Sequence, residues 1–163
     1  PLFADDGFGP AVIEEMQKLV EMKELTLPDN VTIIDAGLGG PHFIFTLLDP
    51  EVTKQLVIID IADFGAEPGS ITKLRVEDLP PGAYRDAHSW DLTEPLQRLQ
   101  DHVKITIIGC QPKRVTSPEF EIGLSDEITK AIPKTIRIVL ETVGVNYGTS
   151  IKCLQERRSA ETS

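Results

Sequence analysis

The segment Gln55-Leu56-Val57-Ile58-Ile59-Asp60 is the most hydrophobic strand that the sequence predicts. Its apolar residues are continuous instead of alternating with polar ones, which is typical of a central parallel strand that is covered on both faces. A similar run over residues 103–108 predicts a second buried strand. Because helical patterns lie before, between and after these runs, we expect a three-layer α/β/α fold around a twisted, mostly parallel sheet.

Further elements flank these two strands. An apolar stripe at helical spacing predicts a helix over residues 10–25, and Pro133 predicts a kink, or two helices, in the helical pattern that begins at residues 123–125. The remaining expected elements are strands at 31–35 and 70–76 and helices at 41–48 and 91–99. We therefore expect a single domain over residues 1–150 and a polar, disordered tail over residues 151–163.

Composition and charge exclude several classes of protein. The 163 residues carry 16 Lys and Arg against 26 Asp and Glu, a net charge of −10, so neither nucleic acid nor a membrane surface is expected as a partner. No apolar run approaches the roughly 18 residues of a membrane span, and the start shows no signal-peptide pattern. Cys110 and Cys153 form no metal or disulfide motif, which favours a reduced cytoplasmic protein.

Acidic residues lie where an α/β sheet would bind a ligand. Ligands collect at the carboxyl ends of parallel strands. Asp35 and Asp60 close predicted strands, and Asp63 lies three residues beyond Asp60. Asp5 and Asp6 precede the first predicted helix, where the more frequent role of a single Asp is to cap the helix.

His88, which precedes a predicted helix, adds a nitrogen ligand to this set. Asp6, Asp60 and His88 together would offer two oxygens and one nitrogen to a borderline divalent cation and leave coordination positions open. Their spacing alone does not show that they meet in space. Cys110 at a strand end is a further candidate nucleophile, although a small buried cysteine is the more common case.

The glycine-rich loop at Gly37, Gly39 and Gly40 is a weak match to a dinucleotide-binding fingerprint, because His42 stands where the third glycine should be. A P-loop is excluded, since no Gly-Lys-Ser/Thr follows. These glycines instead indicate positive φ angles and a close approach of the backbone.

Several short blocks occur in an order that resembles one family. They are Asp5-Asp6-Gly7-Phe8-Gly9, Asp35-x-Gly37-x-x-Gly40, Leu56-Val57-Ile58-Ile59-Asp60, Glu67-Pro68-Gly69, His88, and Gly109-x-x-Pro112 followed by Gly123-Leu124-Ser125. Over about residues 1 to 145 the chain resembles the hydrogenase maturation endopeptidases, which trim the C-terminal extension of a nickel-iron hydrogenase large subunit after nickel insertion. The run Asp-Ala-Gly-Leu-Gly-Gly-Pro-His-Phe further resembles the branch that serves coenzyme F420-reducing hydrogenases of methanogenic archaea.

This resemblance implies a hydrogenase-activating, aspartic-type peptidase that is cytoplasmic, archaeal and monomeric. Its implied partner is the large-subunit precursor, whose own nickel would be contacted by Asp6, Asp60 and His88 rather than being held tightly by the enzyme. One of the two carboxylates would also assist the water as a general base, and Asp60 is the favoured one. Gly37, Gly39 and Gly40 would line the path of the substrate.

Two departures from the family pattern stand out. Leu38 occupies a place where a Thr is usual, so the backbone amides of Gly39 and Gly40 would have to contribute more. Family members also open with a hydrophobic strand directly before the position of Pro1. We therefore expect the native chain to carry roughly ten further N-terminal residues, about one short strand.

Two alternatives from other classes stay open at this point. One is a non-catalytic nucleotide- or partner-binding α/β module that uses the Gly37–Gly40 loop, for which a nucleotide would raise the thermal stability. The other is a different metal-dependent amidohydrolase, for which the isolated protein would contain stoichiometric zinc.

Overall fold

The computed structural model describes residues 4–36, 46–79, 93–113 and 123–146. The sheet within them has three strands in the order β1–β3–β2, namely β1 (Gln55–Ile61), β3 (Lys104–Cys110) and β2 (Ile71–Leu74). β1 runs parallel to β3, with Asp60 opposite Gly109, and β2 runs antiparallel to β3. Since the parallel ladder is the longer one, the expectation of a mostly parallel α/β sheet is confirmed.

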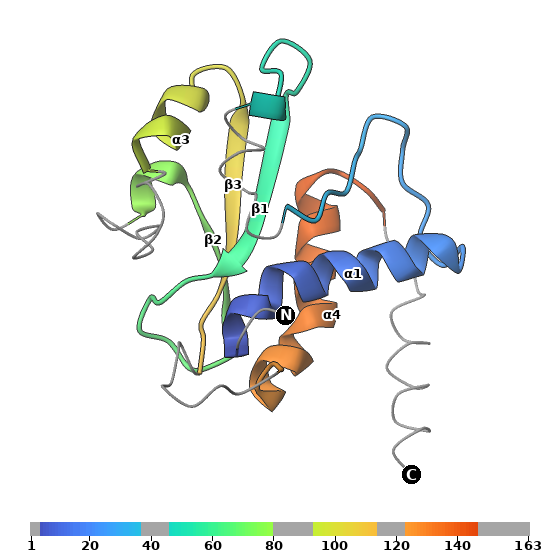
Figure 1. Ribbon diagram of the computed structural model, residues 1–163, viewed down its shortest axis with the longest axis vertical. Coiled ribbons are helices and arrows are strands. Elements are labelled where there is room, and N and C mark those ends of the chain that lie inside the picture. The colour runs from blue at the N-terminus through green and yellow to red at the C-terminus, as the bar shows by residue number, and fades with distance from the viewer. Residues whose placement is uncertain (1–3, 37–45, 80–92, 114–122, 147–163) are drawn as a thin grey trace.

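Helices cover both faces of this sheet (Figure 1). The 3-10 helix η1 (Ala4–Gly7) leads into α1 (Phe8–Glu21), which packs with α4 (Asp126–Thr142) on one face. On the other face lie α3 (Thr93–Leu99) and the short 3-10 helix η4 (Val76–Asp78). These elements form the three predicted layers.

The continuous apolar run of β1 supplies both hydrophobic layers. Val57 and Ile59 pack against the layer of α1 and α4, whereas Leu56 and Ile58 pack against the layer of α3. This division follows from the two-residue period of a strand, whose successive side chains point to opposite faces. By the same alternation, Asp60 leaves the strand on the side of Leu56 and Ile58.

Two predictions are wrong for the described residues. Residues 31–36 form no strand, so β1 lies at an edge of the described sheet instead of at its centre. Val31 and Ile33 still pack against the core, which explains why this segment has the residue pattern of a strand. α4 continues through Pro133 as one helix, so the alternative of two helices is wrong, and the buried Ile132 and Ile136 pack both sides of the proline against the core.

Some expectations fall on residues outside the described ranges. They concern the tail over 151–163, most of the helix expected at 41–48, and the further N-terminal strand expected before Pro1. Among the helices that are described, none combines the length and apolar character needed to cross a membrane.

Candidate functional site

The candidate site lies where the start of α1 meets the carboxyl end of β1 (Figure 1). Gly9 is buried there, and a Cβ atom on it would lie only 2.5 Å from the carbonyl oxygen of Ile59. Only glycine therefore allows α1 to come this close to the strand. The contact brings η1, with Asp6, to the end of β1 that carries Asp60.

The Asp60 carboxyl group has an altered acidity. Burial raises the pKa of Asp60 from 3.8 to about 6, the hydrogen bond from the Ile61 amide opposes this rise, and the negative charge of Asp6 adds to it. The Ile61 amide donates to Oδ1 of Asp60 at 2.8 Å. Two carboxylates from distant parts of the sequence are thus close enough to repel each other, which is the arrangement that a divalent cation relieves.

This raised pKa predicts a pH dependence of stability. Between about pH 4 and pH 6 the folded state holds a proton on Asp60 that the unfolded chain has lost, so the free energy of unfolding falls as the pH rises through this window. The loss is roughly 3 kcal/mol, at about 1.4 kcal/mol for each pH unit. The Asp60→Asn variant lacks the ionisable group and should not show this loss. Its free energy of unfolding in urea should therefore rise relative to that of the wild type from pH 4 to pH 7. A stability difference that does not change over this range would contradict the burial of an ionised Asp60.

Asp5 has different surroundings from Asp6, although both are acidic residues that precede the first predicted helix. It is completely buried, and its Oδ1 accepts hydrogen bonds from the amide and the hydroxyl of Ser125 at 2.9 and 2.8 Å. Its Oδ2 accepts one from the amide of Lys113 at 2.9 Å. The expected capping of the first helix by Asp5 is therefore wrong, because Gly7 is the N-cap of α1 and no side chain bonds there, whereas Asp5 bonds the residue immediately before α4.

The other predicted site residues divide into two groups. His88, Gly37, Gly39 and Gly40 lie outside the described residues, so their positions stay predictions. Within the described part, no three His, Cys, Asp or Glu side chains gather as a metal site would require, and Asp6 and Asp60 form a pair.

Asp35 and Asp63, the other acids near strand ends, are both exposed. Asp63 accepts hydrogen bonds at Oδ1 from the amide of Gly65 and from Nε2 of Gln111. These contacts give Asp63 a structural role in the loop that follows β1. The Asp6–Asp60 pair is therefore the acidic pair to which the geometry points.

Gln111 organises the loop after β1, and sequence reasoning missed it. Its Oε1 accepts hydrogen bonds from the amides of Phe64 and Ala66, and its backbone pairs with Gly69 and Ser70. The side chain is buried, so these bonds are shielded from water. Its place within the block Gly109-x-x-Pro112 was the only signal in the sequence.

Cys110 is unsuited to nucleophilic catalysis. The thiol is completely buried and free, and burial, with a further contribution from the charge of Asp5, raises the pKa of Cys110 to about 11. Because the thiolate is the nucleophile, a thiol that stays protonated near neutral pH is inert. Cys110 acts instead as a small core residue beside α4.

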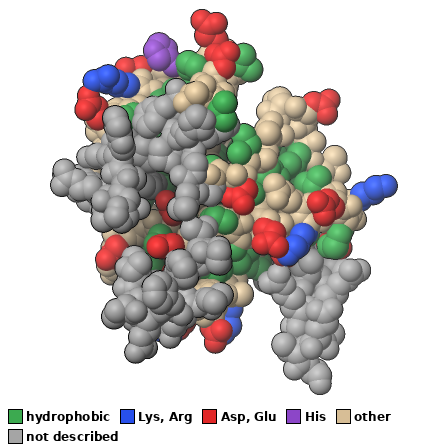
Figure 2. All heavy atoms as spheres, viewed as in Figure 1, with side chains coloured by type: hydrophobic (Ala, Val, Ile, Leu, Met, Phe, Trp, Pro, Cys, Tyr) green, Lys and Arg blue, Asp and Glu red, His purple; other side chains and the backbone are tan. Residues whose placement is uncertain are grey.

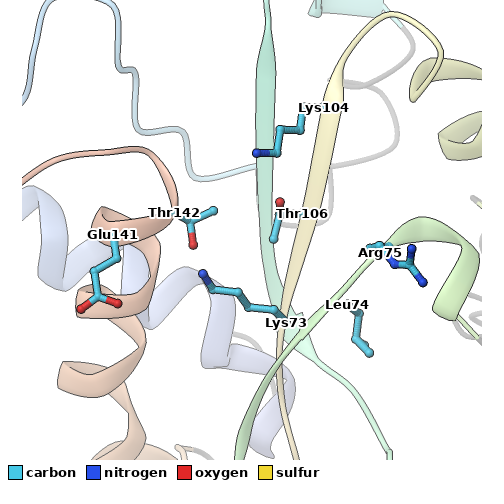
Figure 3. A pocket seen from close by; sticks show the side chains of 7 residues that line it. All are labelled: Lys73, Leu74, Arg75, Lys104, Thr106, Glu141 and Thr142. Carbon is cyan, nitrogen blue, oxygen red and sulfur yellow. The ribbon is translucent and has the colours of Figure 1, made fainter.

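A hollow of about 420 Å³ lies on the opposite part of the sheet (Figure 3). Lys73 from β2, Lys104 and Thr106 from β3, and Glu141 and Thr142 from the end of α4 are among its lining residues. Lys104 begins β3, whereas Gly109, opposite Asp60, is five residues further on, a separation of roughly 17 Å along the strand. Neither Asp6 nor Asp60 is among the residues that line the hollow, and its single carboxylate among lysines is a poor match for metal chemistry.

Comparison with known proteins identifies the family of this chain. The family model described as "Hydrogenase maturation protease" matches residues 10–142. The chain is 42% identical to the coenzyme F420 hydrogenase subunit delta of Methanothermobacter thermautotrophicus over 89% of this chain and 90% of that protein. It is 41% identical to a putative hydrogenase maturation protease of Methanocaldococcus jannaschii over 85% and 88% of the two chains.

Solved structures show the same fold. The hydrogenase 2 maturation peptidase from a Thaumarchaeota archaeon has a TM-score of 0.58 at 28% identity, over 89% of this chain and 93% of that one. The endopeptidase HycI from Escherichia coli has a TM-score of 0.64 at 25% identity, over 90% and 87%. The fold and these likenesses together define a peptidase of the α/β class. Within that class, the chain belongs to the hydrogenase maturation protease family.

Proposed function

We propose that this peptidase removes the C-terminal extension of a nickel-iron hydrogenase large-subunit precursor after nickel has been inserted. Membership of the maturation protease family supports the reaction class. The observation that carries the proposal is the juxtaposition of Asp6 and Asp60 at the carboxyl end of β1. The two residues are distant in sequence, and their position near the carboxyl end of β1 supports the proposal, because α/β sheets commonly bind ligands there.

Nickel enters this proposal as part of the substrate. Asp6 and Asp60, with His88 as the third ligand, would contact the metal that the precursor already carries. Two oxygens and one nitrogen suit a borderline divalent ion and leave positions for the precursor's own ligands. The repulsion between the two carboxylates is relieved when the cation arrives, so recognition favours a precursor that contains nickel.

Asp60 is the residue that we propose to assist the attacking water. A general base works best when its pKa lies near the working pH, and burial brings the pKa of Asp60 to about 6. The carboxylate would accept a proton from the water that attacks the scissile carbonyl carbon. As the C–N bond of the tetrahedral intermediate breaks, Asp60 would give this proton to the departing amine nitrogen. The metal orients the peptide and polarises its carbonyl group.

The precursor that we propose belongs to the coenzyme F420-reducing branch in archaea. The relative at 42% identity is named as a subunit of coenzyme F420 hydrogenase and covers almost all of the chain. The net charge of −10, with acidic side chains spread over the face shown in Figure 2, would favour a basic region on the partner and disfavours nucleic acid. We further propose that a monomer in the cytoplasm meets the precursor transiently, in keeping with the free Cys110.

The requirement for nickel can be tested with matched substrates. Precursor that contains nickel and precursor purified without it should differ strongly, with release of the C-terminal peptide only from the first. The reason is that the carboxylate pair recognises the cation more than the peptide around it. Mass spectrometry of the released peptide measures the rate for each substrate. Equal rates for the two precursors would refute recognition through nickel.

A further inference from the structure

Asp5 is a buried carboxylate that the proposed chemistry does not use. Its hydrogen bonds from Lys113 and Ser125 come from chain segments far from it in sequence. Burial of an acid without such donors would be costly, so these bonds are what allows Asp5 to be completely buried. A side chain with this many fixed partners is a strong anchor for the segment that carries it.

The two partners of Asp5 lie at defined places in the fold. Lys113 follows the carboxyl end of β3, and Ser125 is the residue immediately before α4. A single carboxylate therefore bonds η1 to the exit of one strand and to the start of one helix. A salt bridge joins the same strand end and helix, since Nζ of Lys113 lies 2.7 Å from Oε1 of Glu127 in α4.

The adjacent acid on η1 points to the other strand. A 3-10 helix has about three residues per turn, so consecutive side chains leave it in directions roughly 120° apart. Asp5 is directed toward β3 and α4, whereas Asp6 lies near enough to Asp60 on β1 for their charges to interact. η1 thus spans the ends of the two parallel strands, with one acid anchored and the next one facing the site.

The geometry points to Asp5 as a positioning residue that fixes η1 between β1 and β3 and so holds Asp6 beside Asp60. This inference rests on the proposed function for its catalytic meaning. Replacing the carboxylate by an amide breaks the arrangement, since one NH₂ group would then face the amide of Lys113 or the donors of Ser125. Asp6 would lose its fixed place although it is itself unchanged.

Kinetics with the nickel-containing precursor test this role. Asp5→Asn should raise KM about tenfold and lower kcat/KM by roughly 10- to 100-fold, as is usual when a group that orients a metal ligand is lost. Ser125→Ala, which removes the hydrogen bond from the hydroxyl and keeps the two from backbone amides, should give a smaller change in the same direction. Asp101→Asn, an exposed acid near the start of β3, is the matched control and should behave as wild type.

A second readout needs no substrate. The Ile61 amide donates to Asp60, so its ¹H–¹⁵N resonance should shift in Asp5→Asn and less in Ser125→Ala, while that of Leu19 in the core of α1 stays in place. If Asp5→Asn lowers only the melting temperature and leaves KM and the Ile61 resonance unchanged, Asp5 is merely structural. If Asp5→Asn does not fold, the same two measurements on Ser125→Ala decide between a positioning and a structural role.

The two proposals fail in different ways. Failure of the wild type to cleave the precursor would overturn the proposed function, whereas the Ile61 shift would still support the anchoring of η1. Cleavage by the wild type with an unchanged KM in both variants would overturn the role of Asp5 alone.

Discussion

Asp60→Asn should lower the rate of precursor processing by at least about 100-fold, which is the low end of what general-base catalysis contributes. The substitution keeps the shape of the side chain and an oxygen that can accept the hydrogen bond from Ile61. It removes the charge that would bind nickel and the base that would accept the proton. The rate is measured by the appearance of mature large subunit at enzyme concentrations well below that of the precursor.

The stability of the same variant provides the decisive control. Because burial raises the pKa of Asp60, the ionised wild-type carboxylate destabilises the fold at neutral pH, and Asp60→Asn should be more stable there. A loss of activity that comes with a gain in stability cannot be attributed to misfolding. Asp101→Asn controls for the loss of one negative charge elsewhere on the chain. Full activity of Asp60→Asn would remove Asp60 from the reaction.

Gly9→Ala should destabilise the protein by about 3 kcal/mol and lower its activity, at the upper end of the cost of overpacking. The added Cβ would lie 2.5 Å from the carbonyl oxygen of Ile59, and this oxygen belongs to the backbone and cannot rotate away. α1 must then move from β1, and η1 with Asp6 moves with it. Chemical denaturation and the processing assay measure the two effects.

Whether Gly9→Ala raises or lowers the free energy of unfolding shows whether tight packing or helix propensity dominates at this position. In an ordinary helix, replacing Gly by Ala stabilises by up to about 1 kcal/mol. Gly144→Ala serves as a comparison, because Gly144 has a φ of +76° with open space around it, so only the backbone strain of roughly 1–2 kcal/mol applies. An increase in stability for Gly9→Ala would show that α1 does not press on β1.

The fold was largely predictable because its strands and helices have distinct periods. The unbroken apolar run of β1 predicted a strand with two covered faces, and the apolar stripe of α4 predicted helical structure, although a kink or a division at Pro133 was expected. The segment 31–36 was not predictable in this way. Its β-branched residues fit a strand, but hydrogen bonding to a neighbour depends on the rest of the fold, which a local pattern does not contain.

The candidate site was predictable in part. Asp6 and Asp60 were selected by ligand chemistry, strand ends and family resemblance, and the structure brings them together. The separate role of Asp5 could not be read from the sequence, since its partners lie 108 and 120 residues away. The role of Gln111 in the loop after β1 was not predictable for the same reason, because its hydrogen bonds join segments that are distant in sequence.

The central claim is that this peptidase cuts a nickel-containing hydrogenase precursor at a site built around Asp6 and Asp60. The most direct measurement is the intact mass of the nickel-loaded large-subunit precursor before and after incubation with the folded wild-type enzyme. We predict a decrease equal to the mass of the C-terminal extension with the wild type, and no decrease with Asp60→Asn over the same time. A precursor that keeps its full mass with the wild type, or that is shortened equally by both enzymes, would contradict the claim.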